Sequence, residues 1–231
     1  MRQVNPVKPV LLDSLAAELL DQLAHQPAAR CIVLGGYFAL KHYHDYRVSH
    51  DIDAWWDEAA GESERAQMRR ILTQVLSWIA QSRSLDLRQR KFGDTESWEL
   101  RQDQRAVFSF QISARTVRLE PYLASPWPPL QIESLADNVG SKMNALVQRG
   151  APRDLLDLKE AVDAGLVSPR DCWLLWEQKN PGLDPQAAKL EVTRRLEELA
   201  LRRPLHLIAD TAERERAAAV RCWYRDVFLN V

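Results

Sequence analysis

Residues 34–56 combine a glycine pair and two aspartates within one short piece of chain. The apolar run at residues 31–34 ends at Gly35 and Gly36, and an amphipathic stretch follows over residues 37–46. This order predicts a strand, a tight turn and a helix. Glycine in the turn lets backbone N–H groups approach phosphate oxygens, and the start of a helix favours negative charge. The segment therefore indicates a site for a phosphorylated ligand.

The strand predicted after this turn carries the two aspartates. Ser49, Asp51 and Asp53 alternate along the chain, so the two-residue period of a strand points all three side chains to one face. Two carboxylates on one half-buried face repel each other and lose hydration, but together they can bind a divalent ion. An Asp-x-Asp pair is also common on solvent-exposed strand edges, where it has no functional role. Its position after the glycine turn favours a metal site.

Two segments of the chain together resemble a known family. Gly35, Gly36, Arg47, Ser49 and the run DID at residues 51–53 resemble the signature of the AbiEii/AbiGii toxin family of nucleotidyltransferases, which have a polymerase-beta type core. A second signature of that family follows in the right order at residues 142–158, KMNALVQRGAPRDLLDL. The resemblance covers roughly residues 30–165.

The resemblance implies an α+β fold, with a polymerase-beta-like nucleotidyltransferase core whose mixed sheet is flanked by helices, and a C-terminal helical bundle. It implies that the glycine turn faces the triphosphate of a nucleoside triphosphate (NTP), and that Asp51 and Asp53 bind magnesium (Mg2+). The nucleotide-binding residues expected in this segment are Gly35, Gly36, Arg47 and Ser49.

Hydrophobic periodicity predicts the elements around this segment. Apolar residues recur at helical spacing over residues 11–26 and 57–83, which predicts two helices that pack on the core. The pattern then changes to short runs typical of antiparallel strands, with turns near Gly93 and Ser113. Examples of such runs lie at residues 85–88, 107–110 and 116–120.

Glu120 is a candidate third metal ligand. Polymerase-beta type sites usually add a third carboxylate from a strand beside the Asp pair, and the family more often has Asp at that place. On a strand over residues 116–120, Glu120 would share one face with Arg118. The alternative is a solvated residue at the sheet edge.

The proline-rich segment SPWPPL, residues 125–130, predicts a domain boundary, because neither a helix nor a sheet interior tolerates it. We expect a nucleotidyltransferase core at residues 1–125 and a helical domain, which completes the active-site cleft, at residues 126–231. Its later helices are predicted at residues 170–178, 185–201 and 212–229. They are rich in arginine with acids interspersed, which is typical of solvated faces, although arginines can also bind RNA phosphates.

Lys142 lies on or beside the apolar stripe of the helix that runs through Arg149. Its stem could lie along apolar surface with the ammonium in water, or the ammonium could bind a nucleotide phosphate. The resemblance favours the phosphate.

Asp154 and Asp157 are three residues apart, on one face of a helix that Pro152 can start. An acid in a first helical turn, such as Asp154, also stabilises the helix dipole. In the family, Arg153, Asp154 and Asp157 belong to the active-site wall. The resemblance thus makes Lys142 and Asp154 catalytic candidates, with Asp51 and Asp53, and places Asp157 with Lys142 among the nucleotide-binding candidates.

The composition limits the binding partners and the cellular compartment that we expect for this chain. The formal net charge of −1 provides no global attraction to nucleic acid or membrane. The three cysteines are far apart, and neither a secretory signal nor a membrane-spanning run is seen, so we expect a soluble cytoplasmic protein.

The expected function is magnesium-dependent transfer of a nucleoside monophosphate from an NTP to an acceptor such as tRNA, other RNA or protein. The resemblance implies the toxin of a bacterial toxin–antitoxin or phage-defence system, with an antitoxin protein as partner. The alternatives are an aminoglycoside-type antibiotic nucleotidyltransferase and a nucleotide-binding module without turnover.

Overall fold

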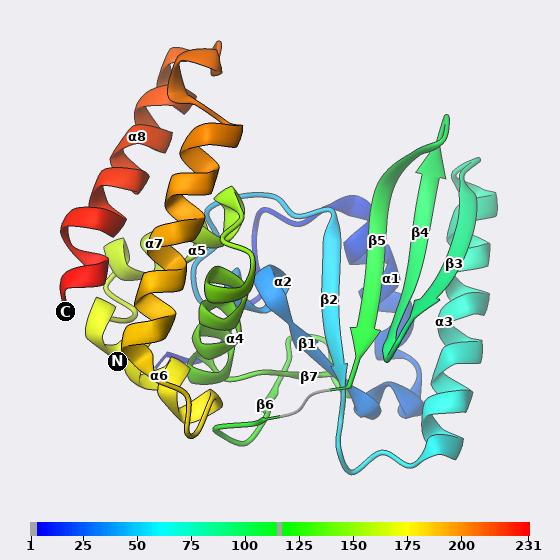
Figure 1. Ribbon diagram of the computed structural model, residues 1–231. Coiled ribbons are helices and arrows are strands. Elements are labelled where there is room, and N and C mark those ends of the chain that lie inside the picture. The colour runs from blue at the N-terminus through cyan, green and yellow to red at the C-terminus, as the bar shows by residue number, and fades with distance from the viewer. Residues whose placement is uncertain (1–3, 115–116) are drawn as a thin grey trace. The chain divides into compact units, whose positions relative to one another are not determined.

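The computed structural model describes residues 4–114 and 117–231 (Figure 1). The chain divides after Asn138 into two compact units, Asn5–Asn138 and a second unit that contains Val139–Val231. The sequence placed the boundary after residue 125. The segment SPWPPL and the short strands beside it instead lie within the first unit.

The first unit is built on a seven-stranded mixed sheet, which confirms the predicted fold class. β2 (Asp51–Trp56) lies in the middle, antiparallel to β1 (Ile32–Gly35) and parallel to β5 (Arg105–Ser113). The strand order is β3-β4-β5-β2-β1-β7-β6. The outer strands are β3 (Asp86–Phe92), β4 (Thr95–Gln102), β6 (Leu123–Ala124) and β7 (Gln131–Ile132).

Helices α1 (Ser14–Ala24) and α3 (Glu62–Ser82) pack on the sheet through one buried apolar cluster, as their periodicity predicted. Asp13 begins α1, because its carboxylate accepts from the N–H groups of the first turn. Burial alternates along β2, with Asp51, Asp53 and Trp55 half-buried and the residues between them buried. The apolar face of β2 therefore completes the core, and the acids lie on the opposite face.

Helix α2 (Gly36–Leu40) is shorter than the predicted helix over residues 37–46. The loop that follows the helix binds the N-terminal segment. Lys41 Nζ donates to Leu11 O, and Asp45 Oδ2 accepts from the N–H groups of Val10 and Leu11 at 2.6 and 2.7 Å. A helix of five residues adds little dipole field at the glycine turn.

The predicted strand at residues 116–120 is wrong where the structure describes it. Residues 117–120 form no strand, and Thr116 lies outside the described residues. The N–H groups of Leu119 and Glu120 donate to the buried carboxylate of Asp137, both at 3.0 Å, so they are not free for a sheet ladder. The strands that pair with β5 are β2 and β4, and the sequence analysis did not single out β4.

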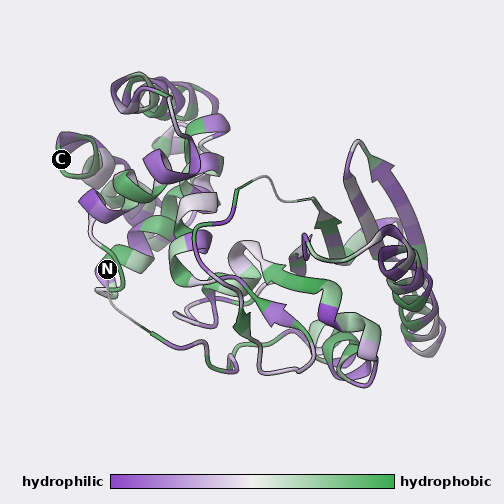
Figure 2. Cartoon of the chain, turned by 90° about the horizontal axis from the view of Figure 1, so that it is seen from below, coloured by the Kyte–Doolittle hydropathy of each residue, from purple (hydrophilic) through white to green (hydrophobic). Residues whose placement is uncertain are grey.

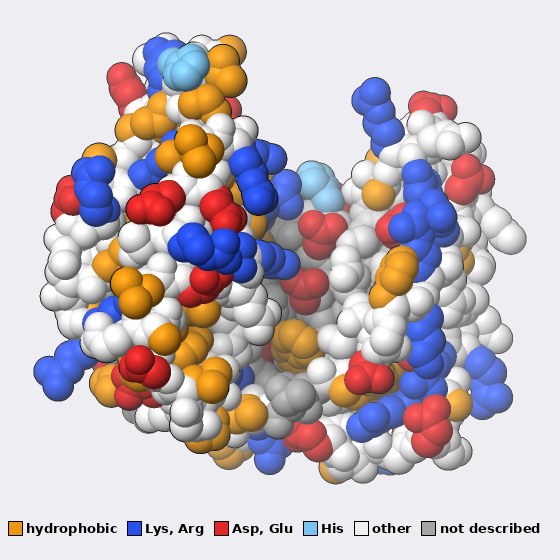
Figure 3. All heavy atoms as spheres, viewed as in Figure 1, with side chains coloured by type: hydrophobic (Ala, Val, Ile, Leu, Met, Phe, Trp, Pro, Cys, Tyr) orange, Lys and Arg blue, Asp and Glu red, His pale blue; other side chains and the backbone are white. Residues whose placement is uncertain are grey.

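The second unit is helical, as predicted, and each helix carries both hydrophobic and hydrophilic residues (Figure 2). Asp184 caps α7, and Ser168 with Asp171 forms a capping box at α6. Basic and acidic side chains lie interspersed on its surface (Figure 3). Arg194, for example, pairs with Glu191 and Glu198. Its helices are α4 (Leu135–Gln148, whose first turn belongs to the first unit), α5 (Pro152–Asp163), α6 (Pro169–Lys179), α7 (Pro185–Arg202) and α8 (Thr211–Asp226).

Among the described residues, no helix combines the length and apolar character needed to cross a bilayer.

His42 makes the stability of the first unit depend on pH. The ring is fully buried against Phe38 and Trp127, and Nδ1 faces the carbonyl of Phe38 at 2.7 Å, so Nδ1 carries the hydrogen. Burial lowers the pKa of His42 from 6.5 to about 4. Between these values the unfolded chain binds a proton that the folded chain does not, so stability falls as the pH falls through this window.

We expect this effect to remove up to about 3 kcal/mol, from 1.36 kcal/mol per pKa unit. Urea unfolding at pH 7 and pH 4.5 checks it. His42→Gln, which keeps a donor and does not titrate, should lose about 2–3 kcal/mol less than the wild type between these pH values. Equal losses in both proteins would contradict the assignment.

Candidate functional site

Asp51 and Asp53 lie on one face of β2, as predicted, and β5 supplies their neighbours on that face. In the parallel ladder, Asp51 pairs with Ser109 and Asp53 pairs with Gln111. Ser109 Oγ donates to Asp51 Oδ1 at 2.8 Å, which orients that carboxylate without cancelling its charge. The sequence did not indicate Ser109, because nothing local distinguishes it from other strand serines.

The glycine pair is required by close packing against β2. Gly36 has φ +58, and a Cβ there would lie 2.1 Å from Asp53 Oδ2. A Cβ on Gly35 would lie 2.2 Å from Trp55 Nε1. Only glycine allows the turn to approach the acid face this closely. The glycine turn and Asp53 therefore lie directly against each other.

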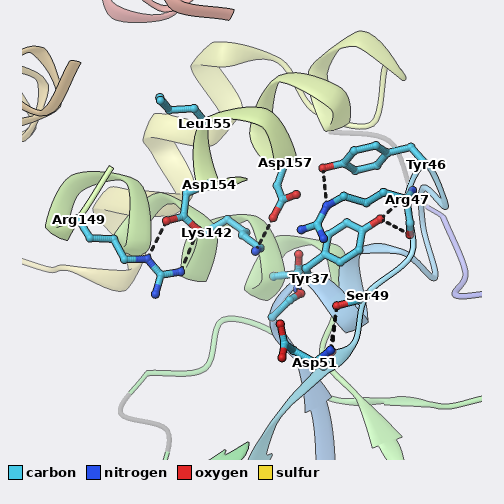
Figure 4. Close-up of polar contacts among 12 residues, drawn as sticks. Tyr37, Tyr46, Arg47, Ser49, Asp51, Lys142, Arg149, Asp154, Leu155 and Asp157 are labelled. Carbon is cyan, nitrogen blue, oxygen red and sulfur yellow. Dashed lines mark hydrogen bonds and ion pairs between the residues drawn. The ribbon is translucent and has the colours of Figure 1, made fainter. Parts of the chain in front are cut away.

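Arg47 and Ser49 lie in the loop before β2 (Figure 4). The Arg47 guanidinium stacks 3.4 Å from the centre of the Tyr37 ring, and its Nε donates to Tyr46 Oη at 3.2 Å. Ser49 precedes the strand rather than lying on it. Its hydroxyl donates to Asp51 O at 3.0 Å and accepts from Asp51 N at 3.3 Å, so it fixes the start of the strand.

Glu120 does not have the strand geometry that made it a candidate. Its backbone is tied to Asp137, as described above, and it lies on no strand of the sheet. Its role as a metal ligand therefore stays a prediction, without the strand that supported it. β5 presents Ser109 and Gln111 at the positions paired with the two aspartates.

Lys142, Asp154 and Asp157 lie in the second unit, on α4 and α5 (Figure 4). Lys142 is nearly buried and its Nζ donates to the fully buried Asp157 Oδ2 at 2.6 Å. Asp154 instead accepts two hydrogen bonds from Arg149, at 2.7 and 2.9 Å. The carboxylate that contacts the lysine is therefore Asp157, whereas Asp154 is held by Arg149.

The donor set fits magnesium. Among the described residues, no group of three or more His, Cys, Asp or Glu side chains is arranged to hold a metal ion. Mg2+ in nucleotide enzymes is commonly held by one or two carboxylates together with waters and substrate phosphates. Asp51 and Asp53, on one face of β2, supply two such carboxylates.

A mixed sheet with an Asp pair beside a glycine turn is consistent with a nucleotidyltransferase-like fold. The family model described as nucleotidyl transferase AbiEii toxin, type IV toxin–antitoxin system, matches residues 18–224, and the chain belongs to this family. No match was found among curated proteins.

Gly36→Ala should destabilise the protein, because alanine is strained at φ +58 and its Cβ would collide with Asp53. We expect a loss of at least about 2 kcal/mol in the free energy of urea unfolding. Gly61→Ala is the control, since no atom lies within 4 Å of a Cβ there. An equal effect of both changes would contradict the packing argument.

Asp157→Asn should also destabilise the protein, because it breaks a buried ion pair and leaves the Lys142 charge buried. Urea unfolding should show a loss of about 3–5 kcal/mol. Asp163→Asn removes a more exposed lysine pair from the same helix and should cost less than about 1 kcal/mol. The prediction fails if the two variants are equally stable.

Proposed function

We propose that the protein transfers a nucleoside monophosphate from an NTP to an acceptor in a magnesium-dependent reaction. The observation that carries the proposal is the position of Asp51 and Asp53 on one face of β2, against the glycine turn. Carboxylates in this arrangement suit a cation that binds a triphosphate. Membership of a nucleotidyl transferase family supports the same chemistry.

In the proposed reaction, an acceptor hydroxyl attacks the α-phosphorus of the NTP. A bond forms between the acceptor oxygen and phosphorus, the bond to the bridging oxygen breaks, pyrophosphate leaves, and the hydroxyl proton is released. Magnesium held by Asp51 and Asp53 would supply positive charge against the charge of the triphosphate.

The other candidate residues would bind and orient the substrates. The backbone at Gly35 and Gly36 would bind phosphate oxygens, with Ser49 and the Arg47 guanidinium beside the nucleotide. Lys142, whose ammonium Asp157 fixes, would offset charge that develops on the phosphates. We assign Asp154 to the acceptor, since its carboxylate is held by Arg149 and not by the lysine.

We further propose that the acceptor is RNA, such as tRNA, or a protein, that the enzyme acts in the bacterial cytoplasm as a toxin, and that an antitoxin protein counters it. The family description, which names a type IV toxin–antitoxin system, supports the toxin role. An aminoglycoside-modifying enzyme would instead confer antibiotic resistance and would not arrest growth on expression.

Transfer is tested by incubating the purified protein with Mg2+, each of the four labelled ribonucleoside triphosphates, and total RNA or total protein. We expect label in one of the two fractions, and a decrease of about 10²–10³-fold for Asp53→Ala. Asp94→Ala, an exposed aspartate in the β3–β4 turn, should transfer normally. Equal incorporation by wild type and Asp53→Ala would remove the Asp pair from the mechanism.

A further inference from the structure

A buried hydrogen-bonded network connects β2 to the glycine turn. Glu133 and Asn138 are both fully buried. Glu133 Oε2 accepts from Trp55 Nε1 at 3.0 Å, and Glu133 Oε1 accepts from Asn138 Nδ2. The same Asn138 amide donates to the carbonyl of Gly36 at 2.6 Å. One carboxylate is thereby connected to the strand that carries the Asp pair and, through Asn138, to the turn.

The backbone of Glu133 is fixed as well. Its N–H donates to Leu34 O at 3.0 Å, and its carbonyl accepts from Tyr43 Oη at 2.8 Å. Burial, and then the negative charge of Glu133, raise the pKa of Tyr43, so the phenol keeps its proton and remains a donor. The carboxylate therefore extends from a backbone that has little freedom to move.

The groups that this network holds are neighbours of Asp53. Gly35 is the ladder partner of Asp53, and the Trp55 indole lies against Gly35. The Asp53 carboxylate in turn lies against Gly36. Glu133 holds the indole and Asn138 holds the Gly36 carbonyl, so a movement of either would change the space available to the Asp53 carboxylate.

We propose that Glu133 and Asn138 are positioning residues for Asp53. They hold the Trp55 indole and the Gly36 peptide, and through them they fix the Asp53 carboxylate in the orientation in which it binds a divalent cation. The inference rests on the proposed function, in which Asp53 is a metal ligand. Groups that form hydrogen bonds around metal-ligating side chains orient those side chains. Loss of such groups weakens metal binding by about 10–100-fold.

The test measures Mn2+ binding by electron paramagnetic resonance of the free ion, together with the melting temperature of each protein. Trp55→Phe removes the indole N–H but keeps an aromatic ring, and Glu133→Gln replaces one acceptor oxygen with an amide nitrogen. We expect each variant to bind Mn2+ about tenfold or more weakly than the wild type.

Trp127→Phe is a matched control. Trp127 Nε1 donates to Asp21 Oδ1 at 3.0 Å, the same length as the Trp55–Glu133 bond, but this bond involves neither Asp53 nor the glycine pair. Both Trp→Phe changes should lower the melting temperature, whereas only Trp55→Phe should weaken Mn2+ binding. A purely structural role for the network predicts the same behaviour for the two variants.

The inference is overturned if Trp55→Phe and Glu133→Gln bind Mn2+ as the wild type does, if Trp127→Phe weakens binding equally, or if the wild type binds no Mn2+. Nucleotide transfer is measured separately on the same proteins. If the wild type transfers no nucleotide but the variants still bind Mn2+ more weakly than it does, the proposed function is contradicted and the positioning role is supported. If the wild type transfers nucleotide but the variants bind Mn2+ as the wild type does, the proposed function is supported and the positioning role is contradicted.

Discussion

The close contact between Gly36 and Asp53 is the constraint on which the candidate site depends. β1 and β2 run antiparallel with Gly35 opposite Asp53, so the turn after β1 must pass directly over the acid face of β2. A Cβ at Gly36 would lie within 2.1 Å of the Asp53 carboxylate. Glycine is needed there for space and for its positive φ, whatever ligand binds. The glycine turn and the acid face of β2 are thus packed directly against each other.

The acids discussed above accept hydrogen bonds from different kinds of donor. In the sheet unit, Asp51, Glu133 and Asp137 accept hydrogen bonds from neutral hydroxyl, indole, amide and backbone donors, while Glu96 is paired with Arg69. A neutral donor orients a carboxylate and leaves its charge in place to attract a cation. In the helical unit, Asp157 and Asp154 are paired with Lys142 and Arg149. Those two acids orient the cationic groups of Lys142 and Arg149.

Most of the secondary structure was predictable from local sequence. The helices α1, α3 and α5–α8 lie where periodicity, prolines and capping residues indicated them, because these signals act within one or two helical turns. The strand expected at residues 116–120 failed because Asp137, distant in sequence, binds the backbone of Leu119 and Glu120. Ser109, Glu133 and Asn138 were missed for a related reason, since each matters only through a partner brought close by folding.

The sequence by itself determined that this chain has a glycine turn followed by two acids on one strand face, and that a lysine and two further acids follow on helices. Those properties depend on residue type and short spacing. Only the tertiary structure decided which partner each acid has: Ser109 for Asp51, Lys142 for Asp157 and Arg149 for Asp154. The reason is physical, because a buried carboxylate takes the donor that packing places within about 3 Å, and that donor can come from any part of the chain.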